Sequence, residues 1–318
     1  MNNPKHHITI PNAEQIAKGF EAIKKIDWAS RLAALGSEAF YVEFDKFFRT
    51  NVGFSIQVIQ PNVTIPSQIN VFRVRQAEGN MDTTLISTFS HPPPFNCKIG
   101  RANLPTYPVF YASPMAHIAI MEAMATLPIE KQIGSRFFLS QWSFRENISL
   151  NISFFVFDNV DKENIFSHYG DTIFQKFKAQ FIHHYGVEGA NNACQVLLGM
   201  SDLFVEGKEY NVSAAIAHSH IYAPHNLRSD IFIYPSIASG KCNVNFALHP
   251  NTVLEKLQLK QIYFFEVTNL PEYQPATKEY TLSTSLLQLG VNKNGIINWC
   301  SPNEKLFKQY KSLFENIY

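Results

Sequence analysis

The stretch GRANLPTYPVFYASPMAHIAIMEAM, residues 100–124, decides the predicted fold because it contains a turn, a strand and a helix in direct succession. PVFYAS (108–113) is a short apolar run after a region of turn residues, which is typical of a strand. Ser113 and Pro114 then mark a helix start, since a serine N-cap accepts an orphan backbone N–H and proline costs nothing at the first helical position. We therefore expect a helix from Pro114 to about Leu127.

Glu122 is an unusual residue within that helix. Residues one turn away on its own face are Ile118 and Ala119 before it and Ala125 and Thr126 after it. We therefore expect dry surroundings, in which an unpaired ionised carboxylate would be costly. The carboxylate must be neutralised, paired with a cation, or held at a cleft where a ligand supplies donors. A structural ion pair explains it as well as a functional site does.

Composition and charge exclude several classes of protein. Hydrophobic residues make up 46% of the 318 residues and charged residues 17%, which favours a packed globular chain over long disordered regions. Because 27 Lys and Arg nearly balance 26 Asp and Glu, no overall field would attract nucleic acid or an anionic membrane, and we expect neither as a partner.

The four cysteines and the N-terminal residues favour a cytoplasmic protein. The cysteines lie far apart without CxxC spacing and are too few to staple a chain of this size, which fits a reducing compartment. The segment MNNPKHHITIPN (1–12) lacks the apolar core of a signal peptide. No apolar run approaches the roughly 18 residues expected of a spanning helix.

Apolar periodicity divides the chain into a small N-terminal region and a larger domain. Residues 12–50 have apolar positions at helical spacing, whereas prolines in 53–68 argue against a long helix or a central strand and indicate a connector. We therefore predict a helical extension and linker in 1–66 and the main domain in 67–318.

Strands and helices both occur in the predicted main domain, so the expected fold class is α+β. Patterns typical of strands lie in 69–76, 108–113, 136–157, 231–237, 244–250 and 261–270. Helical patterns lie in 160–184, 185–204 and 209–222, of which the segment near 160–204 is predicted to be a helical insertion, and a C-terminal extension follows the last of these strands.

Several separated segments occur in the order found in a known family. They are FRVR (72–75), PPP (92–94), GRAN (100–103), PVFYAS, the helix with Glu122, SDIFIYPSI (229–237) and NVNFALHP (243–250). Residues 67–250 thereby resemble the RES domain family, which is named for an arginine, a glutamate and a serine. The specific part of the resemblance is the ordered set Arg101, Tyr111, Glu122, Ser236 and Asn245.

That resemblance implies both a fold and a substrate. RES domains are similar in fold to ADP-ribosyltransferase toxins, with a split, mostly antiparallel β-core and flanking helices. Characterised members act on NAD, either degrading it or passing ADP-ribose to a target protein, and many are toxins paired with an antitoxin. The resemblance therefore implies NAD as substrate, inorganic phosphate as a co-substrate if the cleavage is phosphorolytic, and an antitoxin as a protein partner. The extra helices could instead form the interface of a homo-oligomer.

Glu122 and Tyr111 suit the chemistry that the resemblance implies. Breaking the bond between nicotinamide and ribose builds positive charge on the sugar, as in glycoside cleavage. The Glu122 carboxylate could bind the ribose hydroxyls and stabilise that charge, and a low-dielectric site would strengthen the effect. Tyr111 would stack on or flank the nicotinamide, although a tyrosine in a short apolar strand is often simply part of the core.

The remaining candidates would bind the rest of the ligand. Arg101 and Arg73 would hold the pyrophosphate or an incoming phosphate through charge-assisted hydrogen bonds, and Ser236 and Asn245 would orient the ribose or the amide. Two alternatives stay open: Arg73 could instead pair with Glu78 or Asp82, and Ser236 after a proline could only shape a turn.

Two departures from the family leave the substrate range and the regulation open. The family often has an aromatic residue after the Gly-Arg pair, where this chain has Ala102. The N-terminal extension and the segment near 160–204 exceed a minimal toxin. Protein ADP-ribosylation and a non-catalytic protein whose N-terminal helices dock a partner therefore remain alternatives to NAD cleavage.

Other motifs give weaker signals. AHSHIYAPH (217–225) offers His218, His220 and His225, of which the first two would share a face on a strand but be separated on a helix. No nearby Cys or carboxylate completes a ligand set, so we expect no metal. The chain has no GxSxG elbow, and SGK (239–241) lacks the other residues of a phosphate-binding loop.

Overall fold

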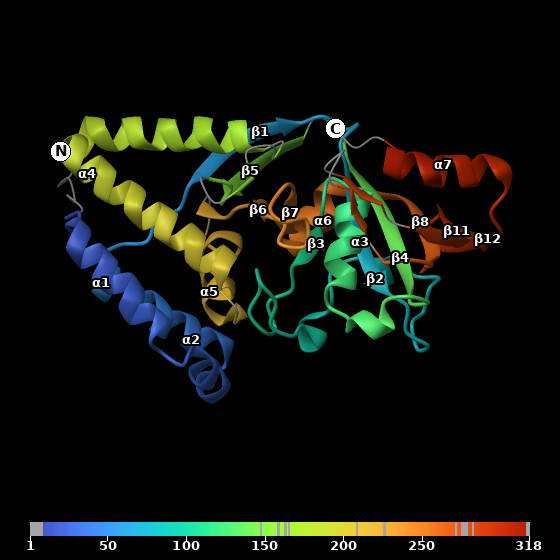
Figure 1. Ribbon diagram of the computed structural model, residues 1–318, viewed down its shortest axis with the longest axis horizontal. Coiled ribbons are helices and arrows are strands. Elements are labelled where there is room, and N and C mark those ends of the chain that lie inside the picture. The colour runs from blue at the N-terminus through green and yellow to red at the C-terminus, as the bar shows by residue number, and fades with distance from the viewer. Residues whose placement is uncertain are drawn as a thin grey trace.

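Two five-stranded sheets form the centre of the molecule in the computed structural model (Figure 1). The structure describes residues 9–315 except 147, 158–159, 162–163, 165, 208, 225–226, 271, 275–278 and 282. The described residues combine both sheets with helices, which confirms the predicted α+β class. No helix in these residues is long and apolar enough to cross a membrane.

The first sheet contains the strands that lead to the candidate site. Its order is β1 (Ile59–Ile65), β5 (Ile148–Phe154), β6 (Ile231–Pro235), β7 (Val244–Leu248) and β3 (Phe110–Ala112). The β5–β6 pair is parallel and the other pairs are antiparallel. Every residue of β6 and β7 is buried, as expected for strands in the middle of a covered sheet.

The second sheet is antiparallel throughout and meets the first at one point. Its order is β12 (Ile296–Cys300), β11 (Thr284–Lys293), β8 (Leu257–Val267), β4 (Arg136–Phe144) and β2 (Asn70–Gln76). Phe72 of β2 and Ser113, just after β3, exchange backbone hydrogen bonds of 2.8 and 2.9 Å. A separate ribbon pairs β9 (Glu272–Gln274) with β10 (Glu279–Thr281).

Helices cover one end of the molecule and fill the junction of the sheets (Figure 1). At the end beyond the first sheet lie α1 (Ala13–Lys24), α2 (Trp28–Val52), α4 (Ser167–Glu206) and α5 (Tyr210–Ile221). α3 (Ala116–Met124) lies between the sheets, and α7 (Glu304–Glu315) packs on the second sheet. α6 (Pro250–Lys256) connects β7 to β8, and short 3-10 turns occupy Ile86–Phe89, Pro94–Asn96 and Ile129–Lys131.

Apolar periodicity explains how the N-terminal helices reach the core. Ile16, Phe20 and Ile23 lie four and three residues apart on one face of α1, and all three are buried. They join a large apolar cluster that also contains residues of α2, α4, α5 and the first sheet. The predicted helical region at 12–50 is thus confirmed, and it shares one core with the first sheet.

The prediction that residues 53–68 form only a connector is wrong for β1. Residues 59–65 pair with β5 at the edge of the first sheet. Pro61 is tolerated there because the register shifts between Gln60 and Val63, and prolines occur at bulges and on edge strands. A strand that precedes residue 67, the predicted start of the main domain, therefore belongs to the first sheet.

The helix that carries Glu122 begins later than predicted. α3 starts at Ala116 with Met115 as its N-cap, and no side chain caps it. Ser113 does not serve as the N-cap because its backbone is extended in the bridge to Phe72, while its Oγ donates to the Val244 carbonyl at 3.1 Å. The predicted break between two helical segments near residue 185 is confirmed, since α4 bends at Gly186, which has φ 73° and ψ −179°.

Gly19 permits the close crossing of α1 and α2, and its replacement is expected to destabilise the fold. A Cβ at this position would lie 2.3 Å from the Asn51 backbone oxygen. Gly19→Ala should therefore cost about 1–3 kcal/mol, despite a gain in helix propensity of about 1 kcal/mol. Thermal unfolding checks this, with Gly79→Ala as a control, because a Cβ at Gly79 would meet no atom within 4 Å. Equal melting temperatures for the two variants would contradict this account of the crossing.

Candidate functional site

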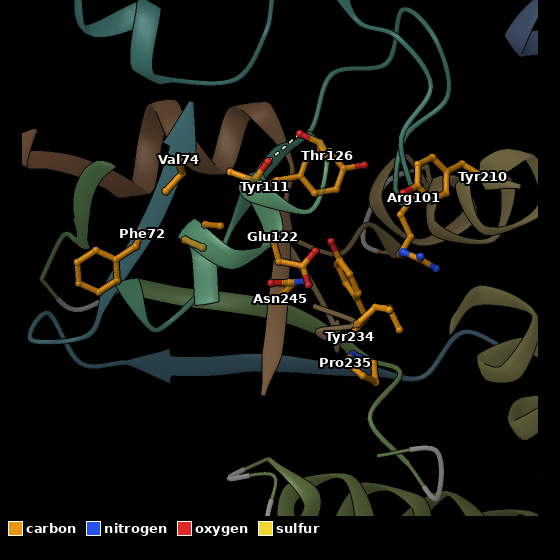
Figure 2. Close-up of a pocket in the computed structure, with 14 residues that line it drawn as sticks. Phe72, Val74, Arg101, Tyr111, Glu122, Thr126, Tyr210, Tyr234, Pro235 and Asn245 are labelled. Atoms are coloured by element: carbon orange, nitrogen blue, oxygen red, sulfur yellow. Dashed lines mark hydrogen bonds between the residues drawn. The ribbon is translucent and has the colours of Figure 1, made fainter. Parts of the chain in front are cut away.

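A cavity of about 260 Å³ lies where α3 meets the first sheet, with Phe72 and Val74 of β2 on one side (Figure 2). Four of the predicted site residues line it: Arg101, Tyr111, Glu122 and Asn245. Residues more than a hundred positions apart in the sequence thus converge on one hollow.

One face of α3 forms a wall of the cavity. Ala119, Glu122 and Ala123 line it at spacings of three and four residues, and Thr126 in the turn after α3 continues the wall. Residues at this spacing lie on the same side of a helix. Because three of the four are small, the glutamate carboxylate is the only ionisable group on this wall.

One face of the first sheet forms the opposite wall. Tyr111 pairs with Ala247, and Tyr234 pairs with Asn245, in the register of β3, β6 and β7. Directly paired residues project from the same face, and so do residues two apart on one strand. Tyr111, Tyr234 and Asn245 therefore point to the same side, where all three line the cavity.

The Glu122 carboxylate is held by three neutral donors on one oxygen. Its Oε1 accepts hydrogen bonds from Ser236 Oγ at 2.5 Å, Asn245 Nδ2 at 2.8 Å and the Ala238 backbone N–H at 3.3 Å. Within the described part of the chain, Oε2 accepts no hydrogen bond and no cation pairs with the group. The donors fix the carboxylate without cancelling its charge, and Oε2 stays available to a ligand.

Of the three explanations for the Glu122 carboxylate, the structure favours a position at a cleft where a ligand supplies donors. The residue is half-buried at a cavity wall, so the surroundings are less dry than expected from the helix pattern. The alternative of a structural ion pair finds no partner among the described residues. Ser236 and Asn245, placed by sequence order alone, are in direct contact with the carboxylate.

Ser236 also shapes the turn between β6 and β7. It therefore has the structural role that the sequence left open as well as its contact with Glu122. Its backbone N–H donates to Asn243 and its carbonyl accepts from Lys241, each at 2.8 Å. Ser239 Oγ donates to the same carbonyl at 3.1 Å. This bonding fixes the loop whose donors hold the carboxylate, and a Lys241–Glu206 ion pair connects the loop to the end of α4.

Tyr111 lines the cavity with its ring and fixes the GRAN turn with its hydroxyl. The hydroxyl donates to Asn103 Oδ1 at 2.7 Å and accepts from the Ala102 backbone N–H at 2.8 Å, and burial raises the pKa of the phenol. A Cβ on Gly100 would lie 2.6 Å from Asn103 Oδ1 and 2.8 Å from the Tyr111 hydroxyl. Glycine is therefore required before Arg101, whereas the Ala102 side chain plays no part in these bonds.

Arg101 presents a positive charge at the cavity. Its Nη1 donates to the carbonyls of Phe204 and Val205 at 2.9 and 3.1 Å, at the C-terminal end of α4. The guanidinium lies 5.1 Å from the ring centre of Tyr210. A cation is favourable at a helix C-terminus, and no carboxylate among the described residues pairs with it. Its charge therefore stays available to an anionic group.

Arg73 is not brought to the cavity. Phe72 and Val74 line it, and alternation along β2 turns the residue between them to the other face. Its Nη1 donates to the Tyr111 carbonyl at 3.1 Å, and desolvation lowers its pKa to about 10. Neither suggested ion pair of Arg73, with Glu78 or Asp82, forms among the described residues. The predicted role in holding the ligand is therefore unsupported by its position.

Two tyrosines of the cavity were not among the predicted site residues. Tyr234 lies two residues before Ser236, and alternation along the predicted strand could have placed it on the same face. Tyr210 follows the bend from α4 to α5, so its position depends on packing that leaves no local pattern.

The histidine cluster does not form a metal site in the described residues. α5 is a helix, so His218 and His220 are separated, and His225 lies outside the described residues. His218 packs against Tyr41, whereas His220 Nδ1 lies 3.2 Å from Ser153 Oγ. Burial lowers their pKa values to about 4 and about 3. No group of three His, Cys, Asp or Glu side chains in this part of the chain could hold a metal ion.

Comparison with protein-family models, with curated proteins and with solved structures finds no match to the chain. The similarity to the RES domain family therefore stays a prediction from the ordered residues. Any function must be inferred from the chemistry of the cavity.

Proposed function

We propose that the chain is a RES-type enzyme that cleaves the nicotinamide–ribose bond of NAD, by hydrolysis or phosphorolysis. The observation that carries the proposal is the Glu122 carboxylate, which three neutral donors hold by one oxygen while the other stays available at the cavity. Arg101 supplies an opposite charge at the same cavity. The Glu122 carboxylate suits a sugar that becomes positively charged during the reaction. The Arg101 guanidinium suits the negatively charged phosphates of the same ligand.

The carboxylate acts through the charge that develops on the ribose. Nicotinamide leaves with the electrons of the glycosidic bond and becomes neutral, so positive charge moves to the ribose carbon and ring oxygen. Glu122 stabilises that charge, and its fixed orientation needs no rearrangement during the reaction. Water or inorganic phosphate then attacks the anomeric carbon, which gives ADP-ribose or ADP-ribose carrying the added phosphate.

The size of the cavity suits part of the dinucleotide. At about 260 Å³ it lies just below the roughly 300–1,000 Å³ of most small-molecule sites, which fits the nicotinamide and its ribose. Tyr111 offers an aromatic face to the nicotinamide. The pyrophosphate then lies against Arg101, and the adenosine extends beyond the cavity.

The biological role follows from the same resemblance. RES proteins that degrade NAD are toxins, and many have an antitoxin partner, so we propose a cytoplasmic toxin or defence effector. This part of the proposal rests on Arg101, Tyr111, Glu122, Ser236 and Asn245 in their sequence order. The cavity residues support the reaction on NAD, and the antitoxin is inferred from the resemblance.

Incubation of the purified protein with NAD tests the proposal. Free nicotinamide should accumulate, and product analysis with and without phosphate should separate ADP-ribose from its phosphorylated form. Labelled NAD with a protein mixture reveals protein ADP-ribosylation, which would replace NAD cleavage as the function if label entered protein. Intact NAD under all three conditions would favour a non-catalytic binding protein.

A further inference from the structure

Tyr234 lines the cavity with a side chain that is mostly buried, and its hydroxyl bonds to none of the residues that the structure describes. The residue is 4% exposed near the end of β6, directly opposite Asn245. Its ring packs against Phe204 of α4 and Phe232 of β6, with ring centres 5.1 and 6.2 Å apart. These contacts fix the orientation of the ring, and the orientation of the ring sets where the hydroxyl lies.

The hydroxyl of Tyr234 differs from those of comparable tyrosines. Tyr111, Tyr222, Tyr263 and Tyr310 each make a hydrogen bond through the hydroxyl to another residue. The Tyr234 hydroxyl makes none with any residue that the structure describes. The hydroxyl is also not one of the fully buried, unpaired side-chain atoms of the described residues, so it reaches the open space of the cavity that Tyr234 lines. A donor kept free in this way is suited to a ligand.

The ionisable groups around the Tyr234 hydroxyl indicate which part of a ligand would lie beside it. Burial raises the pKa of Tyr234 well above its usual value, so the phenol keeps its proton near neutral pH. Four ionisable groups act on it, from Tyr111, Glu122, Arg101 and Tyr210, and all four line the cavity. Figure 2 shows Tyr234 between Glu122 and Arg101.

We propose that Tyr234 donates a hydrogen bond to the phosphate adjoining the ribose, and so selects phosphorylated ribosides over free nucleosides. This rests on the proposed function, in which Glu122 binds the ribose and Arg101 the pyrophosphate. A phosphate is repelled by the Glu122 carboxylate and attracted by Arg101, so it lies on the arginine side of the sugar. Figure 2 shows the Tyr234 side chain between these two groups, and an anionic acceptor makes the stronger hydrogen bond.

Isothermal titration calorimetry with two ligands that differ only in the phosphate tests the proposed role of Tyr234. Nicotinamide mononucleotide and nicotinamide riboside are titrated into the wild-type protein, Tyr234→Phe and the control Tyr263→Phe, whose hydroxyl contacts Gln141 and Gln261 on the second sheet. Tyr234→Phe should bind the mononucleotide at least about tenfold more weakly, because a hydrogen bond to a charged group is lost. Its affinity for the riboside and both affinities of Tyr263→Phe should match the wild type.

The outcomes separate this inference from the proposed function. Wild-type affinity of Tyr234→Phe for the mononucleotide would overturn the inference, and so would an equal loss for both ligands. Failure of the wild-type protein to bind the mononucleotide would overturn it as well. If the wild type binds NAD but releases no nicotinamide, the proposed function fails, while the affinity pattern still decides the role of Tyr234.

Discussion

Glu122→Gln is expected to lower nicotinamide release from NAD at least about 100-fold, the scale on which loss of one preorganised electrostatic partner reduces a rate. Glutamine keeps an oxygen that accepts the bonds from Ser236, Asn245 and the Ala238 backbone. It removes only the negative charge that stabilises the ribose cation. The rate of nicotinamide release under saturating NAD measures the effect.

Controls on Glu122→Gln separate chemistry from folding. Its melting temperature should stay close to that of the wild type, because the hydrogen bonds at Oε1 are retained. Glu130→Gln, at an exposed position on the turn after α3, should keep full activity. A fully active Glu122→Gln enzyme would remove the carboxylate from the mechanism.

Arg101→Ala is expected to raise the KM for NAD about 100-fold, because two or more charge-assisted hydrogen bonds to the pyrophosphate are lost. The change should be larger in KM than in kcat, since the arginine holds a part of NAD remote from the broken bond. Arg101→Lys should restore only part of the affinity. Lysine keeps the charge but cannot reproduce the planar contacts with Tyr210 and with the α4 carbonyls.

The arginine also contributes to the fold, so Arg101→Ala needs a stability measurement beside the kinetics. Its loss frees the carbonyls of Phe204 and Val205, and the melting temperature should fall. Arg145→Ala, at an exposed position after β4, is the matched control and should leave KM unchanged. An unchanged KM for NAD in a folded Arg101→Ala protein would contradict the proposal that Arg101 binds the pyrophosphate.

Those parts of the site that could be predicted are the ones marked by short sequence patterns. The strand at residues 108–113 and the helix after it follow from apolar pattern and proline position, and both occur. Glu122 stood out because a carboxylate among small and apolar residues needs a partner. Ser236 and Asn245 could be placed only through their order in the resemblance, and the structure puts both within hydrogen-bonding distance of Glu122.

Other features depend on contacts that the sequence does not encode locally. Arg73 of FRVR is chemically suitable for phosphate, yet strand alternation turns it away from the cavity while Phe72 and Val74 face it. Which face of β2 meets the cavity is set by its bridge to Ser113. The prolines of 53–68 argue against a central strand, and β1 is instead an edge strand whose bulge accommodates Pro61.

Helices α4 and α5 contribute directly to the candidate site. The last turn of α4 supplies the carbonyls that orient Arg101, and Glu206 pairs with Lys241 in the loop that holds Glu122. The first residue of α5 is Tyr210, which packs beside the guanidinium. The end of α4, where the predicted insertion stops, thus orients Arg101, and α5 adds Tyr210 to the cavity.

The most direct measurement of the central claim is a time course of NAD by proton nuclear magnetic resonance with wild-type protein and with Glu122→Gln. The anomeric proton of the nicotinamide ribose and the signals of free nicotinamide report the bond in question without a coupled assay. We expect wild-type protein to convert the first set of signals into the second, and Glu122→Gln to leave NAD intact over the same period. Equal rates for the two proteins, or no conversion by the wild type, would contradict the proposed role of the cavity.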